Sequence, residues 1–374
     1  MNITIISTAY PLRGGIAHYT ALLAQALGKR HKVSIVTFKR QYPSFLFPGK
    51  TQEEQDESRH PDPAPQLVDS INPWNWLTVG RTLRAQNPDL IIFKYWLPFF
   101  APCFGTILRV AKHGTNCKGL VICDNVFPHE HRPFDKSFTR YLFSATDYFV
   151  VQSHAVEKEL KLFKPDAQLR YSPHPVYDNF GVPMAKQEAR QLLNLTSSRV
   201  LLFFGYVRRY KGLHILLEAI AEVVKTLDVH LLVVGEFYDD EGQYRKQIEE
   251  LGIIRQVSVY SNYVPNAKVA QFFSAADAVV LPYSSATQSG IAQIAYNFDT
   301  PLIVSNVGGL AEVVEDGVTG MIVPPDDPHA LAKTITAFYH GARQQEFSEN
   351  VKRVKHQFTW DNLVHAIESL AGAD

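Results

Sequence analysis

The chain has 374 residues, 46% of them hydrophobic and 20% charged, and its 37 Lys plus Arg balance its 37 Asp plus Glu. These figures are typical of a soluble globular enzyme of two domains, with enough apolar material to need no disulfide or metal staple. The three cysteines show neither a paired framework nor metal-ligand spacing, which suits a reducing, cytosolic compartment.

The sequence shows no pattern of a leader or of a membrane span. The first residues, MNITIIS, form a strand-like apolar run without a basic region or a cleavage site. The longest apolar stretch, Tyr95 to Leu108, is interrupted by Pro98 and Pro102 and is too short to cross a bilayer. We therefore expect a cytoplasmic protein.

The neutral total conceals an uneven distribution of charge. Residues 1–180 carry 21 Lys plus Arg against 15 Asp plus Glu, whereas residues 181–374 carry 16 against 22. A basic first half could face an anionic acceptor or lie peripherally on the inner face of a membrane. Uneven surface charge without any partner is an equally good interpretation.

Short apolar strands alternate with amphipathic helices, which predicts an α/β fold with parallel sheets built of βαβ units. In the first half we expect strands at 2–7, 32–38, 90–93, 119–124 and 148–151. After the first strand, Gly14 and Gly15 stand where a backbone can approach a ligand, and they open a helix whose N-terminal amides suit an anion. A tight turn is the simpler alternative.

Two further groups of residues in the first half could belong to a site. His129 and His131 follow the strand that ends at Asp124, and the ends of strands are where chemistry is placed. A histidine there could donate a hydrogen bond to a sugar, although solvated loop histidines are commoner, and the spacing predicts no metal ion. Aromatic residues such as Trp74 and Trp96 belong mostly to the core, with a minority available for an acceptor groove or a membrane surface.

The composition changes at 171–183, where three prolines in YSPHPVYDNFGVP predict a hinge between two domains. The alternation of strands and helices then resumes and ends in a helical tail from Asp326. We expect strands here at 200–204, 229–234, 257–260, 278–281 and 302–304.

A basic turn follows the strand at 200–204. Gly205 ends that strand and Gly212 opens the next helix, so the loop between them carries Arg208, Arg209 and Lys211. Since open parallel sheets bind ligands at the carboxyl ends of their strands, these cations predict a site for a diphosphate. A solvated basic turn is the alternative.

A second turn suited to an anion follows the strand that ends at Leu281. Thr287, Gln288 and Ser289 offer hydroxyl and amide groups. Ser289 can cap a helix whose first amides, on Gly290 and Ile291, point at the ligand. One such loop could be plain helix capping, but two in one domain favour a diphosphate cradle.

Together these stretches resemble the retaining nucleotide-sugar glycosyltransferases of GT-B architecture, glycosyltransferase family 4. The resemblance covers nearly the whole chain and implies two Rossmann-like domains with parallel sheets facing a cleft. They are an acceptor-binding domain at 1–178 and a donor-binding domain at 179–357, with a C-terminal helix in 358–374 that crosses back. The motifs, in chain order, are the Gly-Gly loop with HYTALLAQALGKRHKVSIVT, FFGYVRRYKG, VVGE, NYVPNAKVAQFFSAADAVVLPY and TPLIVSNVGGLAEVVEDGVTGMIVPPDD.

The resemblance also implies that a basic pair, instead of a metal ion, neutralises the leaving diphosphate, so no cofactor is expected. Lys211 matches the family's lysine, but the family's arginine is Tyr206 here, which leaves Arg208 or Arg209 for that role. His129 is the candidate replacement for the family's histidine, which falls on Asp124 or Asn125. The implied donor-binding residues are Gly14, Gly15, Gly205, Arg209, Gly235, Tyr263, Val264, Thr287, Gln288, Ser289, Gly290 and Ile291.

The chain departs from the family at two glutamates that normally stand eight positions apart, because Thr287 and Ala295 occupy these positions. Thr287 or Gln288 could still hydrogen-bond a sugar. The resemblance predicts transfer of a hexose from a nucleoside diphosphate sugar, with uridine diphosphate (UDP) expected, to an acceptor hydroxyl of a polysaccharide or glycolipid intermediate. No nucleic acid partner is expected. The rival functions are a catalytically silent nucleotide-sugar binding module and a nucleotide-sugar epimerase.

Overall fold

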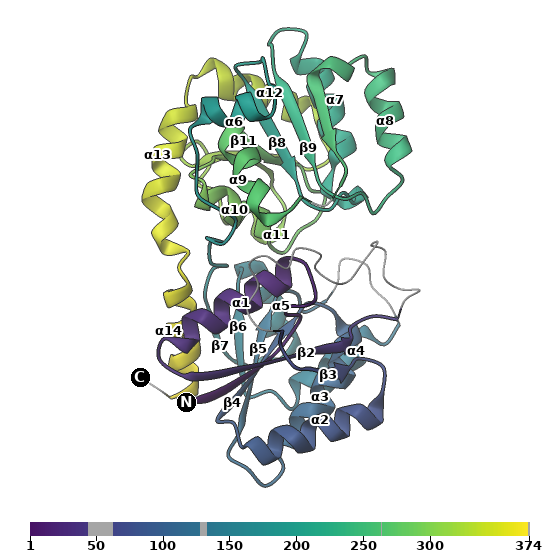
Figure 1. Ribbon diagram of the computed structural model, residues 1–374, viewed down its shortest axis with the longest axis vertical. Helices are drawn as coiled ribbons and strands as arrows, with labels where there is room; N and C mark the ends of the chain where they lie inside the picture. The colour runs from purple at the N-terminus through teal and green to yellow at the C-terminus, as the bar shows by residue number, and fades with distance from the viewer. Residues whose placement is uncertain (44–62, 128–132, 263, 373–374) are drawn as a thin grey trace. The chain divides into compact units, whose positions relative to one another are not determined.

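The structure, a computed structural model, describes residues 1–43, 63–127, 133–262 and 264–372 (Figure 1). Its internal contacts divide the chain into unit 1, Met1–His174 with Thr359–Asp374, and unit 2, Pro175–Phe358. The chain therefore crosses from unit 1 to unit 2 and later returns. The first crossing lies inside the proline-rich stretch at 171–183. The acceptor and donor roles expected of the two domains stay predictions.

Within the described residues, unit 1 is built on a parallel sheet of seven strands in the order β3-β2-β1-β4-β5-β6-β7. All five strands expected in this half are present, and β3 and β7 are additional. These two are edge strands with several exposed residues, so they lack the apolar run that marks a buried strand. The strands are β1 (Asn2–Ile6), β2 (Lys32–Arg40), β3 (Gln66–Asp69), β4 (Leu90–Tyr95), β5 (Lys118–Cys123), β6 (Tyr148–Val151) and β7 (Gln168–Tyr171).

The helices of unit 1 include one from each end of the chain. α1 begins at Gly15, directly after the Gly-Gly loop as predicted. α14 packs on α1 and β7 after the return crossing, and its Glu368 accepts hydrogen bonds from Arg30 and His31, both 2.8 Å long. The expected return of the C-terminal helix to the first unit is thus confirmed. The helices are α1 (Gly15–Gly28), α2 (Pro73–Gln86), η3 (Pro98–Phe100), α3 (Ala101–Lys112), α4 (Asp135–Phe143), α5 (His154–Phe163) and α14 (Trp360–Ala371).

Unit 2 has a second parallel sheet, with six strands among its described residues in the order β10-β9-β8-β11-β12-β13. The five strands expected here are present, and the edge strand β13 is additional. The strands are β8 (Val200–Phe204), β9 (His230–Val234), β10 (Val257–Tyr260), β11 (Ala278–Leu281), β12 (Leu302–Ser305) and β13 (Gly320–Val323).

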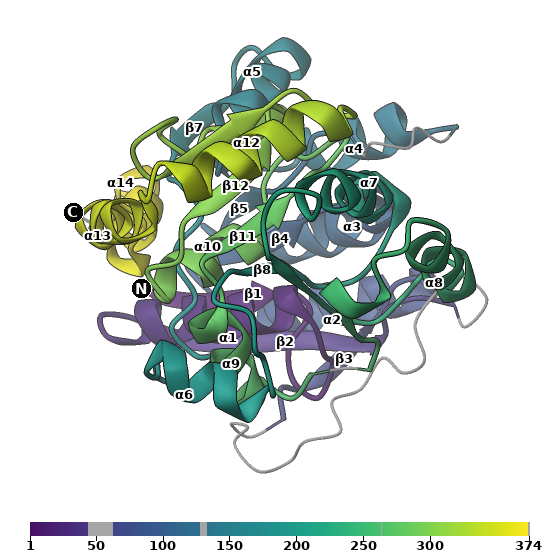
Figure 2. The same cartoon turned by 90° about the horizontal axis from the view of Figure 1, so that it is seen from above.

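Helices cover both faces of this sheet, with α7 and α12 side by side on one face and α6 and α9 in contact on the other (Figure 2). The helical tail expected from Asp326 is confirmed by α12, α13 and α14. The helices of unit 2 are α6 (Lys186–Leu192), η4 (Arg209–Lys211), α7 (Leu213–Val223), α8 (Glu241–Glu250), η5 (Ile254–Gln256), α9 (Asn266–Ala275), α10 (Gly290–Asn297), α11 (Gly308–Ala311), α12 (Pro328–His340), α13 (Gln344–Val354) and η6 (Lys355–Gln357).

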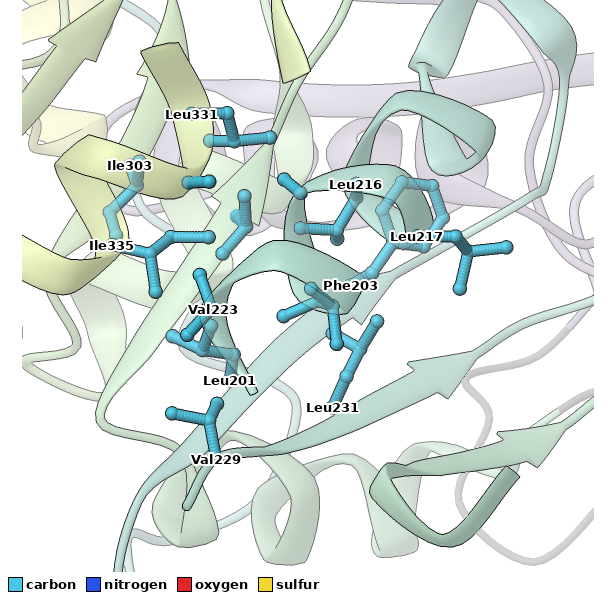
Figure 3. Close-up of a cluster of buried hydrophobic side chains, with 14 of the residues drawn as sticks. Leu201, Phe203, Leu216, Leu217, Val223, Val229, Leu231, Ile303, Leu331 and Ile335 are labelled. Carbon is cyan, nitrogen blue, oxygen red and sulfur yellow. The ribbon is translucent and has the colours of Figure 1, made fainter. Parts of the chain in front are cut away.

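The central strand β8 is buried on both faces. Leu201 and Phe203 belong to a buried cluster with side chains of α7 and α12, among them Leu216 and Ile335 (Figure 3). Phe204, the next residue after Phe203, contacts Phe273 of α9 with ring centroids 4.9 Å apart. Because alternate side chains of a strand point to opposite faces, the run VLLFF had to be apolar throughout.

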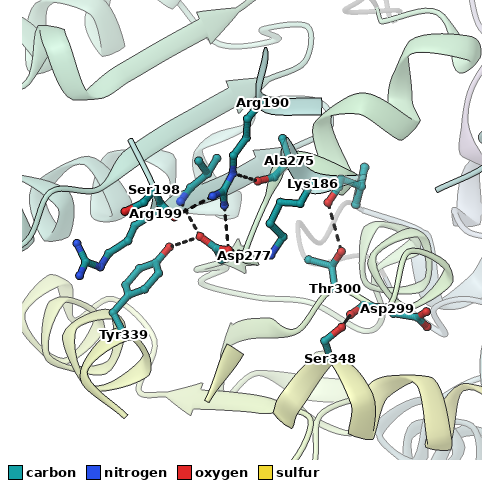
Figure 4. Close-up of polar contacts among 12 residues, drawn as sticks. Lys186, Arg190, Ser198, Arg199, Ala275, Asp277, Asp299, Thr300, Tyr339 and Ser348 are labelled. Carbon is teal, nitrogen blue, oxygen red and sulfur yellow. Dashed lines mark hydrogen bonds and ion pairs between the residues drawn. The ribbon is translucent and has the colours of Figure 1, made fainter. Parts of the chain in front are cut away.

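A buried carboxylate joins the amino ends of β8 and β11. Asp277, just before β11, accepts a hydrogen bond from the backbone amide of Val200 at 2.8 Å. It also forms ion pairs with Lys186 and Arg190 of α6, at 2.8 and 2.9 Å (Figure 4). These contacts fix the amino ends of the two strands. The predicted site lies at the other end of the sheet, at the carboxyl ends of the strands.

Candidate functional site

The predicted anion site lies at the carboxyl ends of β8 and β11. β8 is the first strand of its sheet in the chain and has β9 on one side and β11 on the other, so the strand order reverses here. Loops that follow strands at such a point diverge and leave room for a ligand. The basic turn follows β8 and the Thr-Gln-Ser loop follows β11, so both predicted anion-binding turns belong to this position.

Gly205 shows how closely the two turns approach each other. A Cβ atom on Gly205 would lie 3.4 Å from Nζ of Lys211 and 3.2 Å from Cδ1 of Ile291. The ammonium group of the basic turn and the first turn of α10 therefore meet over this glycine. Its φ of +100° also lies in the left-handed region that favours glycine.

The turn itself is held by its backbone and by the loop after β9. The amide of Val207 donates to the carbonyl of Glu236 at 2.9 Å, which extends the pairing of β8 and β9. The amide of Lys211 donates to the carbonyl of Arg208 at 2.9 Å and forms η4. Gly212 then passes so close to β11 that a Cβ there would lie 1.9 Å from the carbonyl oxygen of Pro282. The position of Lys211 is fixed by the fold.

The surroundings of Lys211 disfavour its positive charge. It is half-buried, and burial lowers the pKa of its ammonium group to about 8, with the nearby charge of Arg208 as the second cause. Its Nζ lies 5.7 Å from the ring centroid of Tyr283. Burial of a charge is costly unless an opposite charge compensates it. An anion between Lys211 and the first turn of α10 would supply that compensation.

The two arginines of the turn have different surroundings. The guanidinium of Arg208 lies 5.1 Å from the ring of Tyr238, and Arg208 is the residue whose charge lowers the pKa of Lys211. Arg209 acts instead on His214 in α7, whose pKa is lowered by burial first and by the Arg209 charge second. Arg208 is therefore the arginine of the turn whose charge acts on Lys211, and its role in binding a diphosphate stays a prediction.

The helix after the second turn begins at Gly290, as predicted, but its cap differs. Ser289 occupies the N-cap position, yet its hydroxyl makes no capping hydrogen bond to the described first turn of α10. The prediction of a Ser289 side-chain cap is wrong, because the Ser289 hydroxyl lies by Tyr283 instead. Burial raises the pKa of Tyr283, and the Ser289 hydroxyl partly opposes this rise. A Cβ on Gly290 would lie 3.2 Å from the ring of Tyr177, so Tyr177 packs on the start of α10.

Of the remaining predicted residues of unit 2, Gly235 lies against Gly205, and the others that the structure describes stand in loops after β10 and β11. Gly235 ends β9 at φ +144°, and a Cβ there would lie 2.1 Å from the carbonyl oxygen of Gly205. Val264 lies in the described loop before α9, Thr287 and Gln288 lie in the loop before α10, and all three are half-buried. Ala295, at the second glutamate position of the family, is fully buried.

The other predicted residues belong to unit 1 or lie outside the described residues. Gly14 and Gly15 lie at the start of α1 in unit 1, with Gly14 at the N-cap and at φ +112°. His129, His131 and Tyr263 lie outside the described residues.

Sequence reasoning missed a buried charged cluster at the carboxyl edge of the unit 1 sheet. Lys94, near the end of β4, donates to Asp124 Oδ1 at 2.5 Å and to Gln152 Oε1 at 2.8 Å. Its Nζ also lies 3.6 Å from the ring centroid of Tyr19 in α1. In the sequence Lys94 appears as a charge flanking an apolar stretch. A lysine inside the strand pattern LIIFKY was the available signal.

Unit 1 also has a basic pocket between α2 and α3. The pocket is about 300 Å³ in volume and is lined by Leu77, Arg81, Arg84, Arg109, Val110 and His113. Neither helix contains an acidic residue, so the pocket is lined by cations without a carboxylate from α2 or α3. Among the described helices, none has the length and apolar character needed to cross a membrane.

Two protein-family matches cover the units in turn. Residues 13–179 match the model described as Glycosyltransferase Family 4, and residues 185–354 match that for Glycosyl transferases group 1. Among curated proteins, the spore coat protein SA of Bacillus subtilis is 28% identical over 53% of this chain and 54% of its own length. A D-inositol 3-phosphate glycosyltransferase of Catenulispora acidiphila is 35% identical over 45% of this chain and 42% of its own. The chain spans about half the length of the curated relatives that it matches.

Solved structures share the complete fold. A sucrose-phosphate synthase of Thermosynechococcus elongatus superposes with a TM-score of 0.79 and 20% identity, covering 100% of this chain and 99% of its own. HepE of Anabaena, solved in complex with UDP, gives a TM-score of 0.76 and 18% identity, covering 100% of both chains. The prediction of two Rossmann-like halves in a GT-B fold is confirmed. Since the two family matches run through nearly all of both units, the chain belongs to the glycosyltransferases of the GT-B fold.

Proposed function

We propose that this protein is a retaining glycosyltransferase that moves a hexose from a UDP-sugar to an acceptor hydroxyl. The observation that carries the proposal is the meeting of the Lys211 ammonium and the first turn of α10 over Gly205. A site of two cations and free helix amides matches the charge of a diphosphate. A UDP complex of HepE and the glycosyltransferase names of the relatives agree with a UDP-sugar donor.

In this proposal the protein acts mainly on the leaving group. Negative charge grows on the diphosphate as the bond to the sugar breaks, and Arg208 and Lys211 stabilise that charge. The amides of Gly290 and Ile291 hold the same oxygens, and the positive end of α10 adds to the effect. In this proposal Thr287 and Gln288, in the loop before α10, hydrogen-bond the sugar. His129 remains a predicted sugar contact.

The proposed acceptor is a glycan or a lipid-linked glycan, in polysaccharide or glycolipid assembly. The basic pocket of unit 1 supports an anionic partner, since arginine side chains suit phosphate groups. Peripheral contact with an anionic membrane surface is part of this proposal, and sedimentation with vesicles of anionic lipid tests it.

A second candidate is a nucleotide-sugar binding module without catalysis. Thr287 and the fully buried Ala295 favour it, because neither carries the carboxylate that the family has at its position. Release of nucleotide from a panel of UDP-sugars and other nucleotide sugars separates the two. A transferase releases the nucleotide, and does so faster with an acceptor, whereas a binding module binds the donor without releasing it. Affinity without turnover across the whole panel would replace the first proposal by the second.

A further inference from the structure

The loop after β9 is paired with the basic turn of unit 2. The amide of Val207 donates to the carbonyl of Glu236 at 2.9 Å, and the amide of Tyr238 donates to the carbonyl of Val207 at 3.0 Å. Val207 and Phe237 also form a parallel bridge. The parallel pairing of β8 with β9 therefore continues past the ends of both strands. Backbone hydrogen bonds thus hold Tyr238 in register with the residues that follow Gly205.

Two tyrosine rings meet across this pairing and contact an arginine. Tyr206 lies against Tyr238 with ring centroids 4.6 Å apart and an angle of 33° between the rings. The guanidinium carbon of Arg208 lies 5.1 Å from the ring centroid of Tyr238. Because alternate residues of an extended strand point to the same face, Tyr206 and Arg208 can both reach Tyr238. The two rings are half-buried and form a tyrosine shelf beside the exposed Arg208.

The tyrosine shelf places Arg208 without neutralising its charge. Arg208 forms no ion pair with any residue that the structure describes. Arg209 is different, because its charge and that of Asp239 both act on the pKa of His214, in opposite directions. An aromatic face attracts a guanidinium through its quadrupole and, unlike a carboxylate, brings no negative charge. The charge of Arg208 therefore stays available for an anion.

Preorganisation gives the contact between Tyr238 and Arg208 a purpose. The side chain of an exposed arginine samples many rotamers, which must be restricted when an anion binds. A contact that restricts these rotamers beforehand lowers the entropic cost and strengthens binding. Lys211 needs no such contact, because the turn itself places its Nζ beside Gly205.

We propose that Tyr238 is a positioning residue that holds Arg208 next to Lys211, so that the two cations bind a diphosphate together. Tyr206 supports Tyr238 by packing on its ring. Tyr238 acts through Arg208 and not through contact with the ligand. This inference rests on the proposed function, because the diphosphate is that of the nucleotide-sugar donor.

A double-mutant cycle tests the coupling of Tyr238 with Arg208. UDP affinity is measured by calorimetry for the wild type, Tyr238→Leu, Arg208→Ala and the double variant, and thermal unfolding checks that each is folded. We expect Tyr238→Leu to weaken UDP binding about 2- to 5-fold, the scale of an exposed cation–π contact, and by no more than Arg208→Ala does. In the Arg208→Ala background, Tyr238→Leu should have no further effect, because the residue that Tyr238 positions is gone. Tyr238→Phe keeps the ring and should bind UDP as the wild type does.

The matched control is Arg343→Ala, which removes another contact between a guanidinium and a ring in unit 2. The guanidinium carbon of Arg343 lies 4.7 Å from the ring centroid of Phe347 in α13. This variant should keep wild-type UDP affinity. If Tyr238→Leu does not fold, Tyr238→Met replaces it in the cycle, because methionine fills an irregular space with a flexible apolar chain.

Three results would overturn the inference and leave the transferase proposal standing. They are wild-type affinity in Tyr238→Leu, an equal loss of affinity in Tyr238→Phe, and a loss by Tyr238→Leu that persists in full without Arg208. The last result would show that Tyr238 contacts UDP or stabilises the turn by itself. Wild-type affinity in Arg208→Ala would remove Arg208 from the diphosphate site, and this inference with it. A wild-type protein that binds no UDP and releases no nucleotide from any donor would remove the proposed function as well.

Discussion

The Nζ atom of Lys211 lies 3.4 Å from the point that a Cβ atom on Gly205 would occupy. The absence of a side chain at Gly205 therefore gives the lysine its place over the end of β8, beside the first turn of α10. This relationship links a backbone requirement of the fold to the charge proposed to bind a diphosphate.

Replacing Lys211 by methionine should separate stability from function. The lowered pKa of Lys211 shows that burial disfavours its charge, so Lys211→Met should raise the melting temperature. The same variant should lose about 10²- to 10³-fold in nucleotide release, the scale of removing one charge-stabilising donor. Differential scanning calorimetry and a nucleotide-release assay measure the two effects. Unchanged turnover in a folded variant would remove Lys211 from the proposed site.

The affinity for UDP should fall as the pH rises through about 8. Lys211 has a pKa of about 8, so above that pH the free protein must take up a proton before the ammonium can bind a diphosphate. The pH dependence of folding stability has the opposite sign to that of UDP affinity. Between about pH 8 and the ordinary lysine value of 10.5 the unfolded chain binds more protons, so this group makes folding more favourable as pH rises. Calorimetric titration with UDP from pH 6.5 to 9.5, about 1.5 units either side of that pKa, tests the affinity. Lys211→Arg, which stays charged, should show no such fall.

Substitutions of Arg208 and of Arg209 should differ in their effect on UDP affinity and on its pH dependence. Arg208→Ala removes the charge that lowers the pKa of Lys211, so the pH at which UDP affinity begins to fall should move upward. It should also weaken UDP binding at pH 7, since one of the two proposed cations is lost. Arg209→Ala should leave the pH dependence in place, because Arg209 acts on His214. If Arg209→Ala lost more UDP affinity than Arg208→Ala, the diphosphate would be assigned to the Arg209 side of the turn.

Gly205→Ala should weaken both folding and nucleotide binding. The left-handed φ at this position costs about 1–2 kcal/mol for a residue with a Cβ, and the new methyl group would displace Lys211 or Ile291. Gly252 is a matched control in the same unit, with φ +69° and no atom within 4 Å of the added Cβ. Gly252→Ala should show a similar loss of stability with wild-type UDP affinity. Equal UDP affinities in the two variants would contradict the crowding at Gly205.

Substitution of Asp277 should lower the free energy of unfolding without changing UDP affinity. Asp277→Ala leaves Arg190 without its carboxylate and the Val200 amide without its acceptor, which should cost about 3–5 kcal/mol of unfolding free energy. Lys186→Ala should cost less than about 1 kcal/mol, because the Lys186 side chain is 46% exposed. Urea unfolding measures both values. UDP affinity at low temperature should remain normal in both, since Asp277 lies at the amino ends of the strands.

Local patterns were sufficient for the central strands and for the positions of the two turns that we propose to bind an anion. The run Val200–Phe204 is apolar because both of its faces are covered, and Leu213, Leu216, Leu217 and Ile220 recur at helical spacing because one face of α7 is buried. The edge strands β3 and β7 escaped prediction because several of their residues are exposed to solvent, which interrupts the apolar run. Lys94 and Asp124 escaped for a different reason, since 30 residues separate them and only the pairing of β4 with β5 brings them together.

Unit 2 is inserted between β7 and α14 of unit 1, and its two ends are joined by a hydrogen bond from the amide of Val176 to the carbonyl of Phe358, 2.9 Å long. This connectivity sets an order for folding during synthesis. All of unit 2 leaves the ribosome before α14, so its sheet can form while unit 1 still lacks the helix that covers α1 and β7. Truncation before Trp360 should therefore expose the face of α1 that α14 covers, whereas the elements of unit 2 keep all their partners within their own unit.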